Sequence, residues 1–182
     1  MARIIDKYTF ISTKNGDGGT SRNYSNDTLA KTDLLFETLG SIDELSSMLG
    51  LTYHHSEYRE DIKSLQLDLQ HIMSLIATRA DDPRYIKLVS IEQTDIERLE
   101  HREQSILSSC RIEPRFVLPG SESTLEGAYL DLARSLARRC ERTILRYIEQ
   151  ENRTDLALVA TYMNRLSDLL FIMARSKDHN KK

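Results

Sequence analysis

Apolar residues recur every three or four positions along most of this chain, which is the spacing that places them on one face of a helix. Short links separate the periodic stretches, so the pattern predicts an all-α fold, a five-helix up-and-down bundle. Three of the expected helices begin near Asp33, near Tyr58 and at 90–93. A fourth spans 125–149, and a fifth, capped by Thr154 or Asp155, ends near Arg175.

Two local signals refine these boundaries. "SIEQ", Ser90 to Gln93, has the form of a capping box at the start of the third helix. Pro83 disfavours helix at the residue before it and is expected to end the second helix.

The first 30 residues lack helical periodicity and contain the segment "TKNGDGGTSR". It has neither of the usual glycine fingerprints for nucleotides. Glycines still allow successive backbone N–H groups to converge on an anion, and Thr13, Lys14, Ser21 and Arg22 add donors and charge. A phosphate-binding loop and a plain surface turn both remain open.

Composition narrows the class of protein. The 182 residues are 40% hydrophobic and 29% charged, which suits one domain over 1–182, with a loop region at 1–30 and a helical bundle at 31–176. The formal charge of −3 gives no basic field for nucleic acid. The two cysteines show no metal or redox spacing, no signal peptide is evident, and no run approaches a membrane span. We therefore expect a reduced cytoplasmic protein.

The fourth helix carries an unusual row of like charges. Arg134, Arg138, Arg142 and Arg146 follow one another at four-residue spacing, with Arg139 beside them. Each neighbouring pair repels by roughly 0.2–0.5 kcal/mol. The opposite side collects the expected core positions Leu132, Ala133, Leu136, Ala137, Cys140, Ile144 and Ile148. The row is either an ordinary solvated face or a surface that meets a polyanion.

The last helix shows a similar division between faces. Asn164, Asp168, Phe171 and Arg175 share a side away from its apolar stripe, as in a partner contact or a binding site. No histidine lies three residues after a glutamate, so a di-iron site is discounted and we assign no metal ligand.

Three blocks together carry a resemblance to a known family. "TKNGDGGTSR", "LGSIDELSSMLGL" and "FVLPG…LARSLARRCER…MNRLSDLLFIMAR" resemble the PduO-type ATP:cob(I)alamin adenosyltransferases, in the same order along the chain. The resemblance implies a homotrimer with sites between subunits. It also implies transfer of the 5′-deoxyadenosyl group of ATP to cob(I)alamin, with ATP, Mg²⁺ and cobalamin as cofactors or substrates. A reductase and a cobalamin-dependent acceptor enzyme are the partners it suggests.

The resemblance also assigns roles to residues. It implies catalytic roles for Arg138, Asp43 and Arg134, the last two as an inter-subunit salt bridge. Phe116, Phe171 and Asp168 would lie on the cobalamin side. The implied ATP-binding residues are Thr13, Lys14, Asn15, Gly16, Ser21, Arg22, Lys31, Arg138, Arg139, Glu141, Arg142 and Asn164.

Four features depart from the family pattern. Gly18 stands where a basic residue is usual, Asp131 replaces a common histidine, and "ARSKD" replaces "ARY". The turn "PGSESTLEG" is two residues longer than usual. These departures leave two alternatives to an efficient enzyme: a weak member that carries or senses ATP or cobalamin, and a plain helical interaction module.

Overall fold

The computed structural model describes residues 7–8 and 12–178, and the five predicted helices are present within them. The first three begin at or within three residues of the expected positions. Two strands and two 3₁₀ turns complete the order. The elements are β1 (Thr20–Arg22), β2 (Thr28–Ala30), α1 (Leu34–Tyr53), α2 (Arg59–Ile76), η2 (Tyr85–Lys87), α3 (Gln93–Leu107), α4 (Leu125–Glu151), η3 (Thr154–Leu156) and α5 (Ala157–Arg175).

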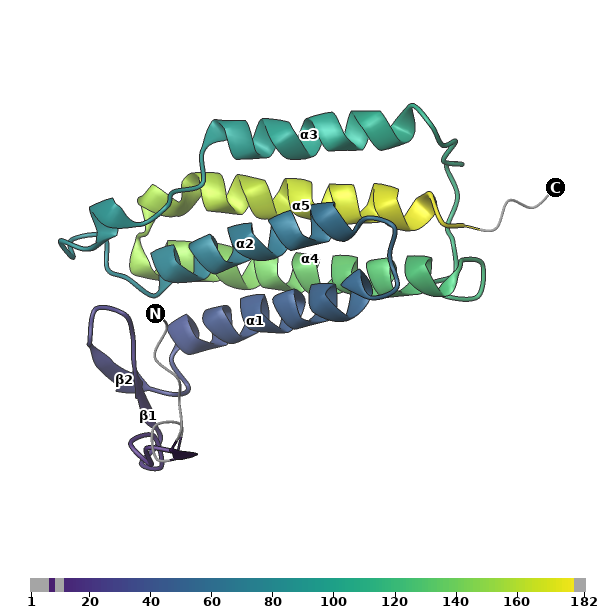
Figure 1. Cartoon of the computed structure of the whole chain (residues 1–182). Coiled ribbons are helices and arrows are strands. Elements are labelled where there is room, and N and C mark those ends of the chain that lie inside the picture. Colours follow the sequence, from purple (N-terminus) through teal and green to yellow (C-terminus); the bar gives the residue numbers. More distant parts are fainter. Residues whose placement is uncertain (1–6, 9–11, 179–182) are drawn as a thin grey trace.

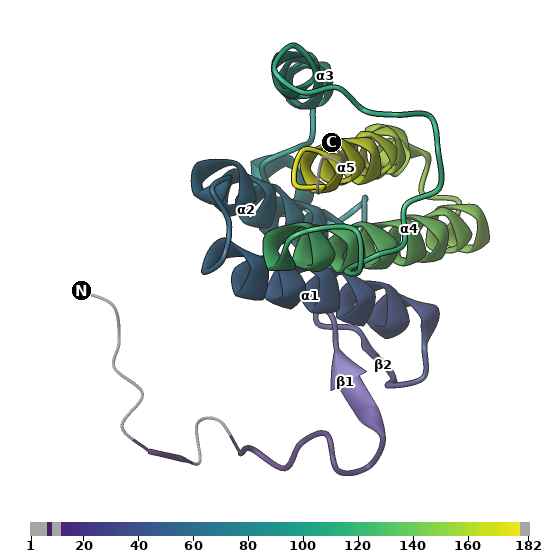
Figure 2. The same ribbon diagram turned by 90° about the vertical axis from the view of Figure 1, so that its right-hand side faces the viewer.

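The helices lie alongside one another, with α4 packed against both α5 and α1 (Figure 1). Helix α2 packs on α1, and α3 packs on α5 at the outside of the group (Figure 2). Ile42, Leu69, Ile144 and Leu166 are fully buried between the helices. The core therefore brings residues from four helices together, and α4 lies at its centre.

The predicted core face of α4 is buried or partly buried except at one position. Ala133, Ala137, Cys140 and Ile144 have no exposed surface, whereas Leu132 is 50% exposed. Leu132 is turned by about 100° from Ala133 around the helix, which carries it past the edge of the buried face.

Two predicted helix caps were wrong. Helix α3 begins at Gln93 after Glu92, whose N–H donates to Asp95 Oδ2 at 2.9 Å, so the box is formed two residues later than "SIEQ". Before α5 the chain makes the 3₁₀ turn η3, and the Asp155 carboxylate accepts from Arg153 Nε at 2.9 Å instead of capping the helix. In the second case the nearby Arg153 competes successfully for the side chain that the sequence suggested.

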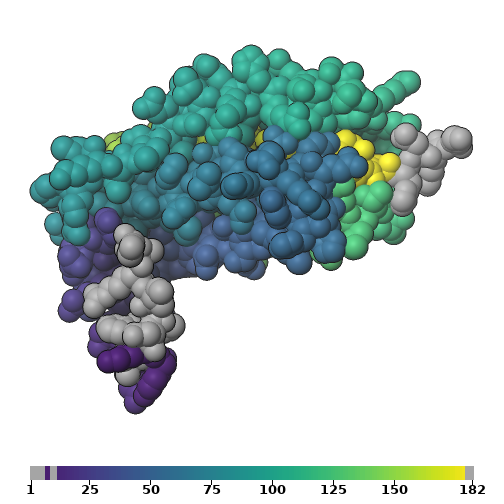
Figure 3. All heavy atoms as spheres, in the orientation of Figure 1, coloured from purple at the N-terminus to yellow at the C-terminus, as the bar shows by residue number. Residues whose placement is uncertain are grey.

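The glycine-containing region forms a small antiparallel hairpin, which the all-α prediction did not include. Thr20 pairs with Ala30 and Arg22 with Thr28. The described residues that precede α1, drawn in purple, project beyond the helical body at the end where α1 begins (Figure 3). This places the predicted phosphate-binding residues Ser21 and Arg22 on a strand.

The hairpin turn is fastened to the segment that follows α2. Tyr24 N–H donates to Ala77 O at 2.8 Å, and Arg79 N–H donates to Ser25 Oγ at 3.0 Å. Arg79 Nη1 also bonds Asp27 Oδ1 at 2.9 Å. Residues 77–79 thus hold the closed end of the hairpin.

The same segment is held from the other side by Arg153, a buried arginine in the turn between α4 and α5. Its guanidinium donates to Leu75 O and to Thr78 O, both at 3.1 Å, and so satisfies carbonyls at the end of α2. Burial opposes its charge, but the adjacent Asp155 carboxylate outweighs burial and raises the pKa of Arg153.

One stretch, Thr154–Arg175, has the length and mean hydropathy of a membrane span, contrary to the sequence prediction that none approaches it. Yet 56% of its most apolar window is buried inside the fold. Its apolar residues are therefore accounted for by helix packing.

Candidate functional site

The structure divides the arginine row of α4 into paired and unpaired members. Arg146 Nη2 bonds Glu37 Oε1 of α1 at 3.1 Å, and Arg139 forms an ion pair with Glu44 of the same helix. Within residues 7–8 and 12–178, Arg138 and Arg142 have neither a hydrogen-bond nor an ion-pair partner. Among the described residues, Arg138 and Arg142, one turn apart, are therefore the members of the row with no partner, whereas Arg134 lacks a carboxylate but contacts the Phe171 ring.

Arg142 opens onto a groove between α1 and α4 with a volume of about 810 Å³. Gly40 and Ser41 line its α1 side and leave room, because neither has a bulky side chain. Its remaining lining residues are Glu37, Glu44, Arg139, Thr143 and Arg146. Sequence reasoning missed Glu37 and Glu44, although their seven-residue spacing on one helix is a signal for a shared face.

The glycine loop lies at the same end of α1 as this groove. Lys31, three residues before α1, has its ammonium against Gly16: a Cβ on that glycine would lie 2.8 Å from Nζ. Lys31 N–H also donates to Gly19 O at 2.8 Å. Two residues that the sequence assigned to ATP are thus in contact.

Backbone conformation in this loop is unusual at two positions. Gly19 has φ of +79°, which only glycine adopts without penalty. Lys14 has φ of 59° although it carries a side chain, a conformation that costs of order 1–2 kcal/mol. Strain of this kind is found at ligand-binding segments. Its occurrence at Lys14 supports a binding role for the loop.

Four of the other predicted ATP residues form two separate pairs. Asn15 N–H donates to Thr13 Oγ1 at 3.4 Å, and Asn164 Nδ2 of α5 donates to Glu141 Oε1 of α4 at 3.1 Å. The second pair joins two helices beside Arg138, which is three residues before Glu141.

The predicted cobalamin-side aromatics meet in a separate pocket at the other end of α4. Phe116 is fully exposed, and with Phe171 it lines a pocket of about 550 Å³. The guanidinium carbons of Arg134 and Arg175 lie 5.1 and 5.4 Å from the centre of the Phe171 ring, within cation–π range. Arg134 and Arg142 are eight residues apart, or about 12 Å along the helix. Arg138 lies between the groove and this pocket.

Two predicted site residues are not drawn into these clusters. Asp43 is exposed on α1 and forms no ion pair with Arg134 of its own chain, so the expected salt bridge would require a second copy. Asp168 accepts from Arg165 Nη1 at 2.5 Å, and Arg165 also contacts Glu100 of α3. Asp168 does not line the pocket of Phe116 and Phe171.

Arg175 was expected on the polar face of the last helix and is instead buried, with 8% of its surface exposed. Asp131 of α4 accepts from its Nη2 at 2.5 Å. Cys140, on the buried side of α4, is shielded as well, and burial raises the pKa of its thiol to about 11.

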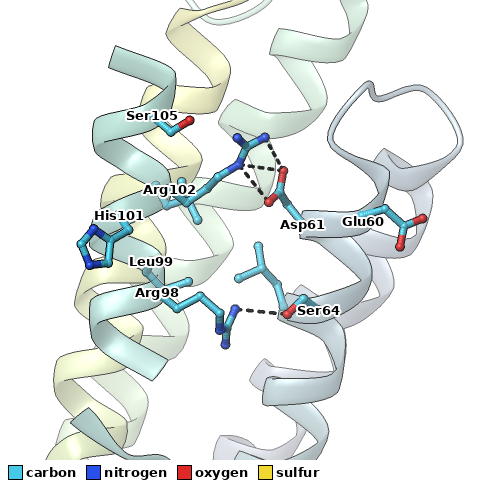
Figure 4. A pocket seen from close by; sticks show the side chains of 10 residues that line it. Glu60, Asp61, Ser64, Arg98, Leu99, His101, Arg102 and Ser105 are labelled. Carbon is cyan, nitrogen blue, oxygen red and sulfur yellow. Dashed lines mark hydrogen bonds and ion pairs between the residues drawn. The ribbon is translucent and has the colours of Figure 1, made fainter. Parts of the chain in front are cut away.

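A different depression lies between α2 and α3 (Figure 4). Its arginines already have partners. Arg102 donates hydrogen bonds of 2.8–3.1 Å to the Asp61 carboxylate, and Arg98 donates to Ser64 and Asp68. None of the predicted site residues lines it. Its charges are used to join two helices, in contrast with Arg138 and Arg142.

Comparison with known proteins identifies the class to which this arrangement belongs. The family model described as cobalamin adenosyltransferase matches residues 11–177. The chain is 34% identical to human corrinoid adenosyltransferase MMAB over 172 residues, covering 91% of this chain and 67% of that protein. It is 32% identical to a Citrobacter freundii corrinoid adenosyltransferase, covering 92% and 94%.

Solved structures agree. A variant of the PduO-type ATP:corrinoid adenosyltransferase from Lactobacillus reuteri, complexed with cobalamin and ATP, matches with a TM-score of 0.82 and 31% identity. The match covers 91% of this chain and 92% of that one. The chain belongs to the cobalamin adenosyltransferase family.

Proposed function

We propose that this protein transfers the 5′-deoxyadenosyl group of ATP to cob(I)alamin. The Co(I) centre supplies the electron pair of the new bond to the ribose C5′. The C5′–O bond breaks, and the leaving oxygen departs with its electrons on triphosphate. The products are adenosylcobalamin and triphosphate.

The observation that carries this proposal is the pair of unpartnered guanidinium groups, Arg138 and Arg142. Carboxylates of α1 are available to α4 and already engage Arg139 and Arg146. Leaving two neighbouring arginines unpaired maintains a repulsion that an anionic ligand would relieve. A triphosphate has the charge and oxygen geometry to accept both forks.

The residues of this chain have two tasks in such a reaction. Because Co(I) is itself the nucleophile, no side chain needs to attack. The loop cations Lys14 and Lys31, with Arg138 and Arg142, would stabilise the charge that gathers on the leaving triphosphate. The pocket of Phe116 and Phe171 would receive the corrin and orient cobalt toward C5′.

Mg²⁺ fits this site as a companion of the nucleotide. Across the described ranges, 7–8 and 12–178, no group of three or more histidine, cysteine or acidic residues could hold a metal. Mg²⁺ commonly binds through substrate phosphates and water with few protein ligands. When bound, it would neutralise phosphate oxygens alongside the lysines and arginines.

A homotrimer is part of the proposal, because Asp43 and Arg134 do not meet within one chain. Their pairing across an interface would bring the loop end of one copy toward the aromatic end of another. Asp43→Ala is then expected to weaken assembly and activity together; an unchanged trimer by light scattering would contradict the pairing. We further expect a cytoplasmic location, a reductase that supplies cob(I)alamin and an acceptor enzyme for the product.

One assay tests the reaction. Purified protein is mixed with ATP, Mg²⁺ and chemically reduced cobalamin, and the visible spectrum is followed. Appearance of the alkylcobalamin spectrum supports the enzyme. Binding of ATP without alkylation would favour a carrier or sensor, and no binding of either substrate would leave only an interaction module.

A further inference from the structure

A buried charge cluster lies behind the Phe171 pocket. Arg175 Nη2 donates to Asp131 Oδ2 at 2.5 Å, and Arg175 Nε lies 2.8 Å from Asp178 Oδ2. The Arg175 and Asp131 side chains are only 6% and 5% exposed. Removing such charges from water is costly, and buried ion pairs often add little net stability. The cluster therefore calls for an explanation other than stability.

Arg175 uses the cluster to keep one fixed position beside Phe171. Its guanidinium carbon lies 5.4 Å from the centre of that ring, while its Nη2 is hydrogen-bonded to Asp131 and its Nε lies within ion-pair distance of Asp178. Arg134 contacts the same ring at 5.1 Å but is more exposed and lacks a carboxylate partner within the described chain. Of the two cations on Phe171, Arg175 is the anchored one.

The third member, Asp178, connects the cluster to the loop that carries Phe116. Asp178 forms an antiparallel bridge with Ser123, and Thr124 N–H donates to Lys177 O at 3.1 Å. Gly127 permits this close approach, because a Cβ there would lie 1.8 Å from Ser123 Oγ and 3.1 Å from Lys177 Cβ. Residues 177–178 are thus fastened to the base of the loop before α4.

Three features in which the sequence departs from the resemblance meet at this point: Asp131, the longer turn at 119–127 and the segment that follows Arg175. Their mutual contacts explain how they occur together. The longer turn is closed by residues 177–178, and Asp131 supplies the buried carboxylate that fixes Arg175.

We propose that Asp131 is a positioning residue for the corrinoid substrate, acting through Arg175 on Phe171 and through Asp178 on the loop of Phe116. This inference rests on the proposed function, and it assigns to Asp131 an effect on one substrate only. Loss of its charge frees Arg175, and the ring no longer has a fixed position under the corrin. Binding of ATP, at the α1–α4 groove and glycine loop, is not altered.

Asp131→Asn tests this proposal, with Asp68→Asn as the matched control. Asp68 is also a buried aspartate on a helix, held by Arg98 at 2.7 Å and by the Tyr162 hydroxyl at 2.6 Å, and it lies outside both parts of the site. Asp131→Asn is expected to raise the KM for cob(I)alamin about tenfold, since small displacements of positioning groups are costly. The KM for ATP should stay within about twofold, the spread of independent effects. Asp68→Asn should lower thermal stability and leave both KM values unchanged.

A second measurement separates this inference from the proposed reaction, and a second variant tests the role of Arg175 directly. Equilibrium dialysis with cob(II)alamin measures corrinoid binding without turnover, so an inactive wild-type protein would refute the proposed reaction and still leave this inference testable. Arg175→Lys keeps the charge but removes the flat guanidinium, and it should weaken corrinoid binding as Asp131→Asn does. The proposal would be overturned by equal changes in both KM values, or by the same pattern in Asp68→Asn. It would also be overturned by unchanged corrinoid binding in both Asp131→Asn and Arg175→Lys, or by no corrinoid binding to the wild-type protein.

Discussion

Replacing Arg138 by alanine should change stability and activity in opposite directions. Arg138 has like-charged neighbours four residues away on either side, Arg134 and Arg142, and no partner in the described part of the chain. Removing two repulsive pairs of roughly 0.2–0.5 kcal/mol each stabilises the fold by about 0.4–1 kcal/mol. Alanine is also the better helix former. For a domain of this size, the melting temperature rises by about 1–4 °C.

The same substitution removes a group that we place against the leaving triphosphate. Loss of one such donor typically lowers turnover by about 10²–10³-fold. Thermal unfolding followed by circular dichroism measures the first effect, and the rate of adenosylcobalamin formation measures the second. At about 1 M salt the Debye length falls to about 3 Å, and the gain in stability should disappear.

Arg59→Ala is the control for this experiment. Arg59 is an exposed arginine at the start of α2, where its guanidinium lies 5.9 Å from the Tyr53 ring, and it belongs to no part of the proposed site. Its replacement should leave the rate of adenosylation unchanged. Surface substitutions usually change stability by no more than about 0.5 kcal/mol. If Arg138→Ala destabilises the fold by more than about 1 kcal/mol, the residue has a structural role. An unaltered rate would refute the assignment to the site.

The surroundings of Gly18, Cys140 and Asp155 each give a further prediction. A side chain on Gly18 meets open space, so Gly18→Lys should lower the KM for ATP by about two- to fivefold, as a surface charge pair allows, whereas Gly18→Ala should not. At pH 8 a thiol reagent should modify half-buried Cys110 readily and Cys140 only after unfolding, because burial raises the pKa of the Cys140 thiol to about 11. Burial opposes ionisation of Asp155, but hydrogen bonds from Arg153 and Tyr85 outweigh it and lower its pKa, so its contribution is present above pH 4 and is lost as the pH falls through the lowered value. Urea unfolding should show Asp155→Asn to be less stable at pH 7 and less sensitive to acid; an acid limb like that of the wild type would contradict this.

The helices were predictable because their periodicity is local, and the exceptions depend on distant partners. Leu132 was misplaced because its exposure depends on where α1 and α5 contact α4. Arg175 was placed on the polar face of the last helix, because its partner Asp131 lies 44 residues earlier and no local pattern points to it. A local pattern predicts which side of a helix a residue lies on, but it does not predict which residue of another helix lies opposite.

The candidate site shows the same limit. The arginine row was evident from spacing alone, whereas the division into paired and unpaired arginines was not. That division depends on Glu37 and Glu44, which lie about a hundred residues earlier and face α4 only in the folded chain. The glycine loop could be located from its composition, but its hairpin and its anchor at 77–79 could not.

The anchored hairpin also bears on the energetic cost of capturing a nucleotide. Ordering a free segment costs roughly 1–2 kcal/mol per residue in backbone entropy. Here the turn of the hairpin is tied to Ala77 and Arg79 before any ligand arrives, and Lys31 is already bonded to Gly19. The turn and the Lys31 end of the hairpin therefore need no further ordering, so more of the attraction between cations and phosphates is retained as affinity.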